Sequence, residues 1–414
     1  MKLIASLVAL AIAAPISAQT VAVTHAQAWT LEGDTPVHDA TILIESGKIL
    51  SVTSGGAVPE GATVIDARGK PVTPGLVNAA TQIGLVEVSG SGDTRDTASA
   101  DERNAGFDMS RALNGNSTLV SLARADGLTR ALVYPSPSRF APFNGEASFV
   151  RLREGVDILD RSDIGVYAVI GGGAWERLGS RAVQWAALRK VLNEARPDAR
   201  PKKGKKGKVG GPPGKRAGEL LIRAVLRGDV PLAIQTDRES DMRQAAALAR
   251  DFGIRVVIVG GAEAWRAADA LAAAKIAVIL DPQANLPRSF DELGNRQDNA
   301  ALLRRAGVAL ALGQVGGTIH SNYNAGLALR EGAGLAVANG LSWIEGLRAV
   351  TVAPLAIWGR GGGTLTPGAD ADLVVWDGDP LEPSTNAVRV IIEGREVSNR
   401  SRQDVLAERY KEAR

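Results

Sequence analysis

The stretch Pro74-Gly75-Leu76-Val77-Asn78-Ala79-Ala80-Thr81-Gln82 marks the point where one sequence pattern gives way to another. Before it, residues 21–72 form short β-rich runs separated by turns. After it, apolar runs alternate with helical patterns. The stretch begins apolar and ends in Thr81 and Gln82. We therefore expect the first buried strand of the second pattern here, with polar residues at its carboxyl end.

The alternating pattern covers roughly residues 73–360 and predicts an α/β fold. Helical patterns occupy 241–251, before Gly253, and 262–274, and Ser342 with Glu345 forms a capping box that opens a helix toward Leu355. Apolar runs typical of buried parallel strands lie at 131–134, 165–170, 231–235, 256–260, 277–281 and 308–313. This repeat predicts a (β/α)₈ TIM barrel. An open doubly wound sheet is the alternative, although no G-x-G-x-x-G motif follows a strand.

A second, smaller domain is expected from both ends of the chain. Residues 40–52 have the pattern of a β-hairpin around a Ser-Gly turn. The segments 371–380 and 388–397 have the same β-rich texture. We predict a small β-sandwich assembled from residues 19–72 and 361–400, followed by a tail at 401–414.

The first residues predict where the protein is located. Lys2, an apolar run over 3–14 and the small residues before Gln19 are typical of a cleaved signal peptide at 1–18, which implies a periplasmic or secreted protein. The alternative is a retained N-terminal anchor. No transmembrane segment is expected in the mature chain. The absence of cysteine excludes disulfides and thiolate metal sites.

Basic charge is concentrated in one segment. Residues 197–218 hold eight Lys or Arg against one Asp, whereas all 414 residues have a net charge of only +3. Rich in Lys, Gly and Pro, this segment is predicted to be a disordered loop. It is either a solvated loop or a surface for anionic lipid. No nucleic-acid partner is expected, because the run has no interleaved aromatic residues.

Residues 74–82 closely resemble the P-G-L-I-D-x-H-x-H signature of amidohydrolases, the metal-dependent C–N hydrolases. Residues 368–380 resemble the family's G-x-x-A-D-L-V-V-x-D-G-D-P element, whose carboxylates we expect to be structural. The likeness of 127–133 to G-V-T-T-x-L-V, and of 143–147 to a G-G-Q-G-A loop, is finer and points to the imidazolonepropionase-like branch. The resemblance spans roughly residues 21–400.

The family's metal ligands are replaced in this chain. Ala80 and Gln82 stand in place of two histidines, Gly260 in place of a third, and Val315 where the metal-bound Asp is usual. The family uses zinc or another divalent metal. None of the four replacements is a good ligand for such a metal, so no metal cofactor is expected and the standard hydrolysis is disabled.

Polar residues nevertheless gather at the predicted strand ends. Asp237, Asp281 and His320 are the candidate catalytic groups, because a lone imidazole near a carboxylate can act as a general base. The candidate ligand-binding residues are Gln82, Gln235, Arg238, Gln283, Gln314 and Asn322.

Three functions remain open from the sequence. The first is a secreted, inactive or altered amidohydrolase-like protein that binds a small polar molecule or an active homologue, as a homo-oligomer or heteromer. The second is a divergent hydrolase with a site rebuilt from Asp237, Asp281 and His320. The third is a surface-binding module that uses the basic segment 197–218.

Overall fold

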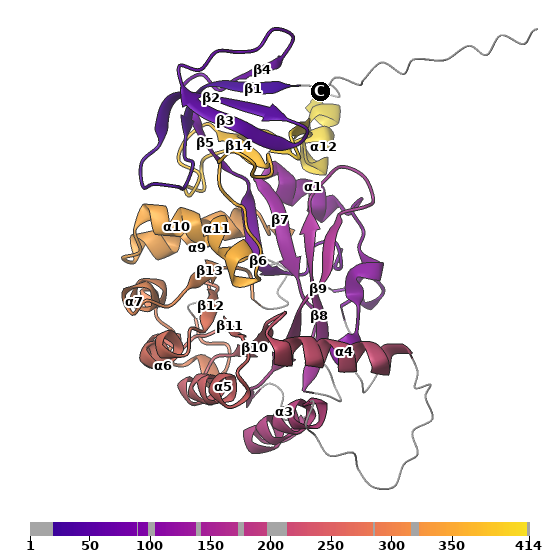
Figure 1. Cartoon of the computed structure of the whole chain (residues 1–414). Helices are drawn as coiled ribbons and strands as arrows, with labels where there is room; N and C mark the ends of the chain where they lie inside the picture. Colours follow the sequence, from indigo (N-terminus) through magenta and orange to yellow (C-terminus); the bar gives the residue numbers. More distant parts are fainter. Residues whose placement is uncertain are drawn as a thin grey trace, which may run out of the picture.

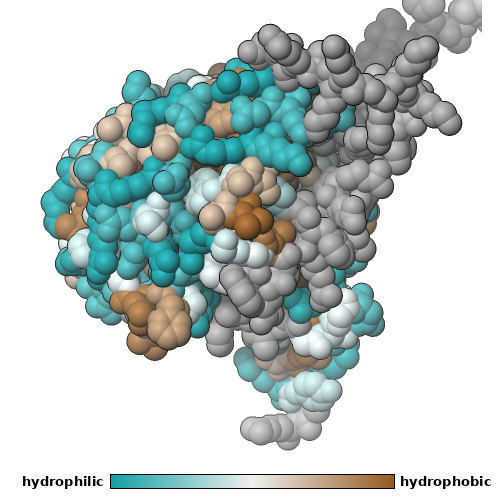
Figure 2. All heavy atoms as spheres, turned by 90° about the horizontal axis from the view of Figure 1, so that it is seen from below, coloured by the Kyte–Doolittle hydropathy of each residue, from teal (hydrophilic) through white to brown (hydrophobic). Residues whose placement is uncertain are grey.

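A computed structural model describes residues 20–88, 90–97, 104–137, 142–172, 178–196, 213–284, 286–315 and 323–411. The predicted signal peptide therefore lies outside the described residues. Within these ranges no helix combines the length and apolar character that crossing a membrane requires. Seen from below, the molecule is mainly hydrophilic with separate hydrophobic patches (Figure 2).

Two eight-stranded sheets organise the chain, one at the top of Figure 1 and the other in the middle of the molecule below it. The central sheet follows chain order: β6 (Leu76–Thr81), β7 (Leu128–Val133), β8 (Phe143–Arg151), β9 (Leu159–Val169), β10 (Leu232–Thr236), β11 (Val256–Gly260), β12 (Ala277–Leu280) and β13 (Leu310–Leu312). A β-carbon on Gly313 would lie 2.7 Å from the backbone nitrogen of Ala80, so the last strand approaches the first. The protein is a mixed α/β fold with a nearly closed barrel-like sheet.

One strand departs from the predicted eightfold βα repeat. The segment 143–147, expected as a loop, begins β8, which runs antiparallel to both β7 and β9, whereas the other neighbouring strands are parallel. The connections at 134–142 and 152–158 are shorter than the dozen or so residues that a parallel crossover needs. Adjacent strands joined by such short connections pair as hairpins.

Helices that follow the other strands along the chain cover the outside of the barrel (Figure 1). They are α1 (Thr118–Ala125), α3 (Arg181–Ala195), α4 (Pro213–Arg227), α5 (Glu239–Phe252), α6 (Ala268–Ala273), α7 (Asn299–Arg305), α9 (Leu327–Ala338), α10 (Trp343–Ala349) and α11 (Val352–Ile357). Short 3₁₀ turns are η1 (Gly92–Thr94), η2 (Asn104–Gly106), η3 (Met109–Ala112), η5 (Ala264–Ala267) and η6 (Phe290–Glu292). The basic segment 197–218 lies outside the described residues up to 212, and 213–218, expected as disordered loop, instead begin α4.

Ser342 is confirmed as the N-cap, because its hydroxyl accepts from the Glu345 amide at 3.3 Å. The Glu345 carboxylate accepts from the Ser342 hydroxyl at 3.0 Å, in place of the backbone amide that a full capping box would use. The single helix expected to follow is two helices, α10 and α11. Pro354 has no N–H to donate to the carbonyl of Val350, so the helix cannot run through. That carbonyl instead accepts from the Val77 amide of β6 at 2.7 Å.

The second sheet joins both ends of the chain. It contains β1 (Val21–Ala28), β2 (Val37–Glu45), β3 (Lys48–Ser54), β4 (Thr63–Asp66), β5 (Pro71–Pro74), β14 (Leu373–Trp376), β15 (Ala387–Ile392) and β16 (Arg395–Val397). The order is β16-β15-β14-β5-β1-β2-β3, with β4 beside β1. All eight strands thus belong to one hydrogen-bonded sheet, and the predicted sandwich of two sheets is not observed. In the expected C-terminal tail, α12 (Arg402–Lys411) forms a helix.

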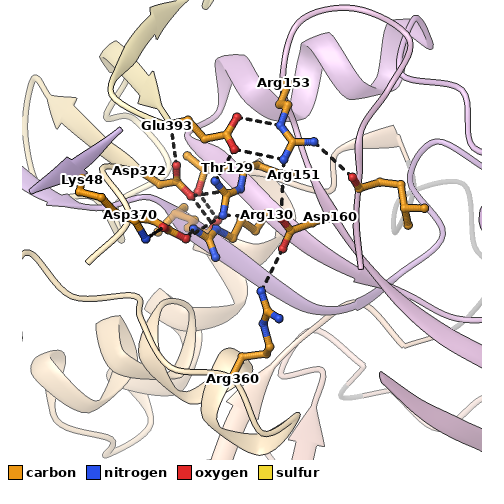
Figure 3. A network of polar contacts seen from close by, with 12 residues as sticks. Lys48, Thr129, Arg130, Arg151, Arg153, Asp160, Arg360, Asp370, Asp372 and Glu393 are labelled. Carbon is orange, nitrogen blue, oxygen red and sulfur yellow. Dashed lines mark hydrogen bonds and ion pairs between the residues drawn. The ribbon is translucent and has the colours of Figure 1, made fainter. Parts of the chain in front are cut away.

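An ionic network ties this sheet to the amino-terminal end of the barrel (Figure 3). Arg130 of β7 donates to Asp372 at 2.5 Å and also to Asp370. Arg151 of β8 donates to Asp370 and to Glu393, each at 2.7 Å. Burial raises the pKa of Asp370, but the hydrogen bond from Lys48, together with these arginines, holds that pKa well below its usual value. The structural role expected for the carboxylates of 368–380 is therefore confirmed for this pair.

Candidate functional site

The barrel interior is apolar where a metal centre would be expected. Ala80 and Val315 are buried, with 0% and 6% exposure, in one cluster with Tyr134, Tyr167 and Trp358. The rings of Tyr134 and Tyr167 stack with centroids 4.9 Å apart. Two of the four family-ligand positions are therefore occupied by small or branched hydrocarbon side chains packed against aromatic rings.

The other two positions are equally unsuited to a metal. Gly260 has a φ of 98°, and a β-carbon there would lie 2.7 Å from the Oδ1 atom of Asp237. The Gln82 amide is 5% exposed and donates to the Tyr134 carbonyl at 3.3 Å and to Ser136 at 3.2 Å. Among the described residues no three His, Cys, Asp or Glu side chains are grouped to hold a metal. These residues do not fit the family's metal centre.

A polar cavity of about 60 Å³ lies at the carboxyl ends of β10 to β13. Three predicted site residues meet there: Gln235 and Asp237, at and just after the end of β10, and Asp281 just after β12. The strand-end rule for barrels accounts for this convergence. Its other lining residues are Gly260, Ala262, Leu280, Ala284, Arg288, Glu292, Asn295 and Val315.

Both aspartates of the cavity have a raised pKa. Burial raises the pKa of Asp237 to about 6, although its carboxylate accepts from the Ala262 amide at 3.2 Å. Burial likewise raises the pKa of Asp281 to about 6, against the Gln283 amide at 3.1 Å. The charge of Arg288 lowers both values without cancelling the effect of burial.

Other predicted residues are engaged elsewhere. The side-chain amide of Gln314 contacts that of Asn78, and both are buried. Gln283 is exposed and donates to Glu331 at 2.8 Å, while Arg238 lies 3.7 Å from Asp291.

His320 and Asn322 lie outside the described residues, so a catalytic pairing of His320 with either aspartate stays a prediction.

Sequence reasoning missed the part of the site that comes from an irregular segment. Arg288, Glu292 and Asn295 follow β12 and line the cavity. Glu292 accepts from the Arg288 backbone amide at 2.8 Å, and Asp291 accepts from Gly172 at 2.8 Å. The four-residue spacing of Arg288 and Glu292 was an available signal for this local ion pair.

No protein-family model and no curated protein matches the sequence. Solved structures do match. An amidohydrolase from Thermotoga maritima MSB8 is 24% identical over 92% of this chain and 100% of its own, with a TM-score of 0.80. Molinate hydrolase is 18% identical over 93% and 96%, with a TM-score of 0.56. N-isopropylammelide isopropylaminohydrolase from Burkholderia multivorans ATCC 17616 is 16% identical over 92% and 98%, with a TM-score of 0.52. The resemblance to amidohydrolases predicted from the motifs is confirmed as a likeness of fold.

Proposed function

We propose that this protein is a metal-free member of the amidohydrolase fold that binds a small polar molecule at the carboxyl end of its barrel. The observation that carries the proposal is the contrast between positions within that mouth. Ala80 and Val315 fill the metal position with hydrocarbon, whereas Gln235, Asp237 and Asp281 line a polar cavity beside it. Secretion to the periplasm and association with an active homologue stay part of the proposal.

The chemistry of the cavity restricts its ligand. Three carboxyl groups, one guanidinium and two side-chain amides supply both hydrogen-bond donors and acceptors. A volume of about 60 Å³ admits a few waters or one small polar group. We therefore expect a ligand that presents a compact head with both donors and acceptors, such as an amide or a urea.

Elemental mass spectrometry tests the loss of the metal. The untagged protein, dialysed against zinc and manganese salts and then against metal-free buffer, should retain far less than one metal per chain. The matched sample carries Val315→Asp, which restores only one ligand and should stay equally metal-free. One equivalent of tightly bound metal in the wild-type protein would overturn the proposal.

A second candidate function is metal-free hydrolysis by the two aspartates. The observation in its favour is that the two aspartates of this cavity, Asp237 and Asp281, each have a pKa raised to about 6, close to the value that suits a general acid or base near neutral pH. It is tested by screening small amides for turnover. Turnover that is lost in both Asp237→Asn and Asp281→Asn would favour catalysis over binding alone.

A further inference from the structure

A second cavity lies outside the barrel, between α4 and the hairpin of β8 and β9. Its volume is about 300 Å³. Its walls are mostly hydrocarbon, from Ala217, Leu220, Leu221 and Ala224 of α4 and from Val230. Two carboxyl groups, Glu146 and Asp163, also line it. Neither belongs to the mouth of the barrel.

Glu146 is an unusual group for such a place. It is 4% exposed, and its Oε2 atom has no hydrogen-bond partner among the described residues. The chain places it there because β8 turns the alternate side chains of 146, 148 and 150 outward, while Ala147 and Phe149 pack in the barrel interior. Burying an unpartnered carboxyl oxygen is costly unless something outside the chain satisfies it.

The charges facing Glu146 are predominantly negative. Burial first, and then the hydrogen bond to Asp163 on β9, raise the pKa of Glu146 to about 9. Asp108, beside η3, raises it further, whereas the charge of Arg111 in η3 lowers it. The α4 residues that line the cavity carry no charge. Asp163 also has a φ of 57°, a conformation that residues other than Gly, Asn and Asp seldom adopt.

We propose that this cavity binds a small organic ammonium ion, with its N–H groups on Glu146 and Asp163 and its hydrocarbon part against α4. An ammonium supplies three donors and the positive charge that the site lacks. A neutral alcohol would leave the second carboxylate uncompensated. When the cation enters, Glu146 gives up its proton to solvent and becomes a carboxylate, so one proton is released for each cation bound.

Isothermal titration calorimetry of the full chain with n-butylamine, and with n-butanol as the neutral probe of matched shape, tests the proposal. We expect saturable binding of the amine only. Because the proton competes with the cation, affinity should rise about tenfold per pH unit between roughly pH 6 and pH 8. Titration in two buffers of different ionisation enthalpy should report the released proton.

Four variants test the contribution of individual residues. Glu146→Gln and Asp163→Asn, which keeps a side chain tolerant of positive φ, should each weaken amine binding at least about tenfold. Ala224→Leu should block the cavity without touching either carboxyl. Asp237→Asn, which alters the proposed site at the barrel mouth, should leave the affinity for n-butylamine unchanged, and this separates the two sites. Equal binding of butanol, no binding of butylamine, or a pH-independent affinity unchanged in Glu146→Gln would overturn the proposal.

Discussion

The pKa values of buried carboxyl groups are shifted in opposite directions at the two ends of the barrel. At the amino-terminal end, Asp370 and Asp372 lie against the guanidinium groups of Arg130 and Arg151, and the pKa of Asp370 is well below its usual value. At the carboxyl end, Asp237 accepts from a backbone amide and burial raises its pKa to about 6. The difference lies in the partner, because burial acts on both groups in the same direction.

This contrast distinguishes carboxyl groups that hold the structure together from carboxyl groups that can take part in function. A carboxylate fixed by arginines is ionised at every working pH and contributes to joining the two sheets. A carboxyl whose pKa lies near neutrality can change its charge when a ligand arrives. Substitutions at one end of the barrel and then at the other test this difference.

The largest effect is expected from Arg130→Ala. Arg130 is 5% exposed and contacts two carboxylates, so its removal leaves two negative charges near each other with one less cation. Breaking a buried pair on one side costs about 3–5 kcal/mol. Urea denaturation should show a loss of stability of this order. Arg389→Ala, which removes an exposed pair with Glu396, is the control and should cost less than about 1 kcal/mol.

A smaller effect is expected from Gly260→Ala at the mouth. The positive φ of Gly260 and the 2.7 Å approach of its virtual β-carbon to Asp237 should together cost about 1–3 kcal/mol. Gly253→Ala is the matched control, since Gly253 also has a positive φ but no atom within 4 Å of its virtual β-carbon. Equal losses in the two variants would mean that the mouth has room for a side chain after all.

The smallest effect is a pH dependence of opposite sign at the two ends. With its pKa raised from 3.8 to about 6, Asp237 holds a proton in the folded protein that the unfolded chain has released. Its contribution to stability therefore falls as pH rises from about 4 to 6. Asp237→Asn should make the protein more stable than wild type at pH 7 by roughly 1–2 kcal/mol, allowing for its partial exposure.

The contribution of Asp370 to stability should depend on pH with the opposite sign. The pKa of Asp370 is lowered, so its stabilising contribution is present above the unfolded value and is lost as pH falls below about 4. At neutral pH, the denaturation midpoint of Asp370→Asn should lie below that of the wild type, and the midpoint of Asp237→Asn should lie above it. A common direction would contradict the assignment of the two ends.

Much of the fold could be predicted because its strands are continuous apolar runs. The runs at 232–236 and 256–260 are buried parallel strands, as expected. β8 was missed because Asn144, Glu146 and Ser148 make it look like a loop, although every residue in it is buried. The polar outward face of this strand reflects tertiary contacts that local pattern does not contain.

The site was predicted in part for a similar reason. Asp237 and Asp281 follow strand ends, and a barrel brings strand ends together. Gln314 also follows a strand, but the side-chain amide of Asn78 occupies it. Arg288 comes from an irregular segment whose path no periodicity describes. The strand-end rule places residues at the mouth, whereas partners decide which of them remain available.

The pairing of β5 with β14 carries a consequence for how the chain reaches this fold. Val72 pairs with Val375, and the Trp376 indole donates to Thr73 at 2.9 Å, so strands about three hundred residues apart share hydrogen bonds. During synthesis from the amino terminus, the edge of β5 has no partner until the last tenth of the chain has emerged. An unpaired strand edge is a template for aggregation. The chain is therefore most vulnerable to misassembly until β14 has been synthesised, and truncations that remove β14 should be tolerated poorly.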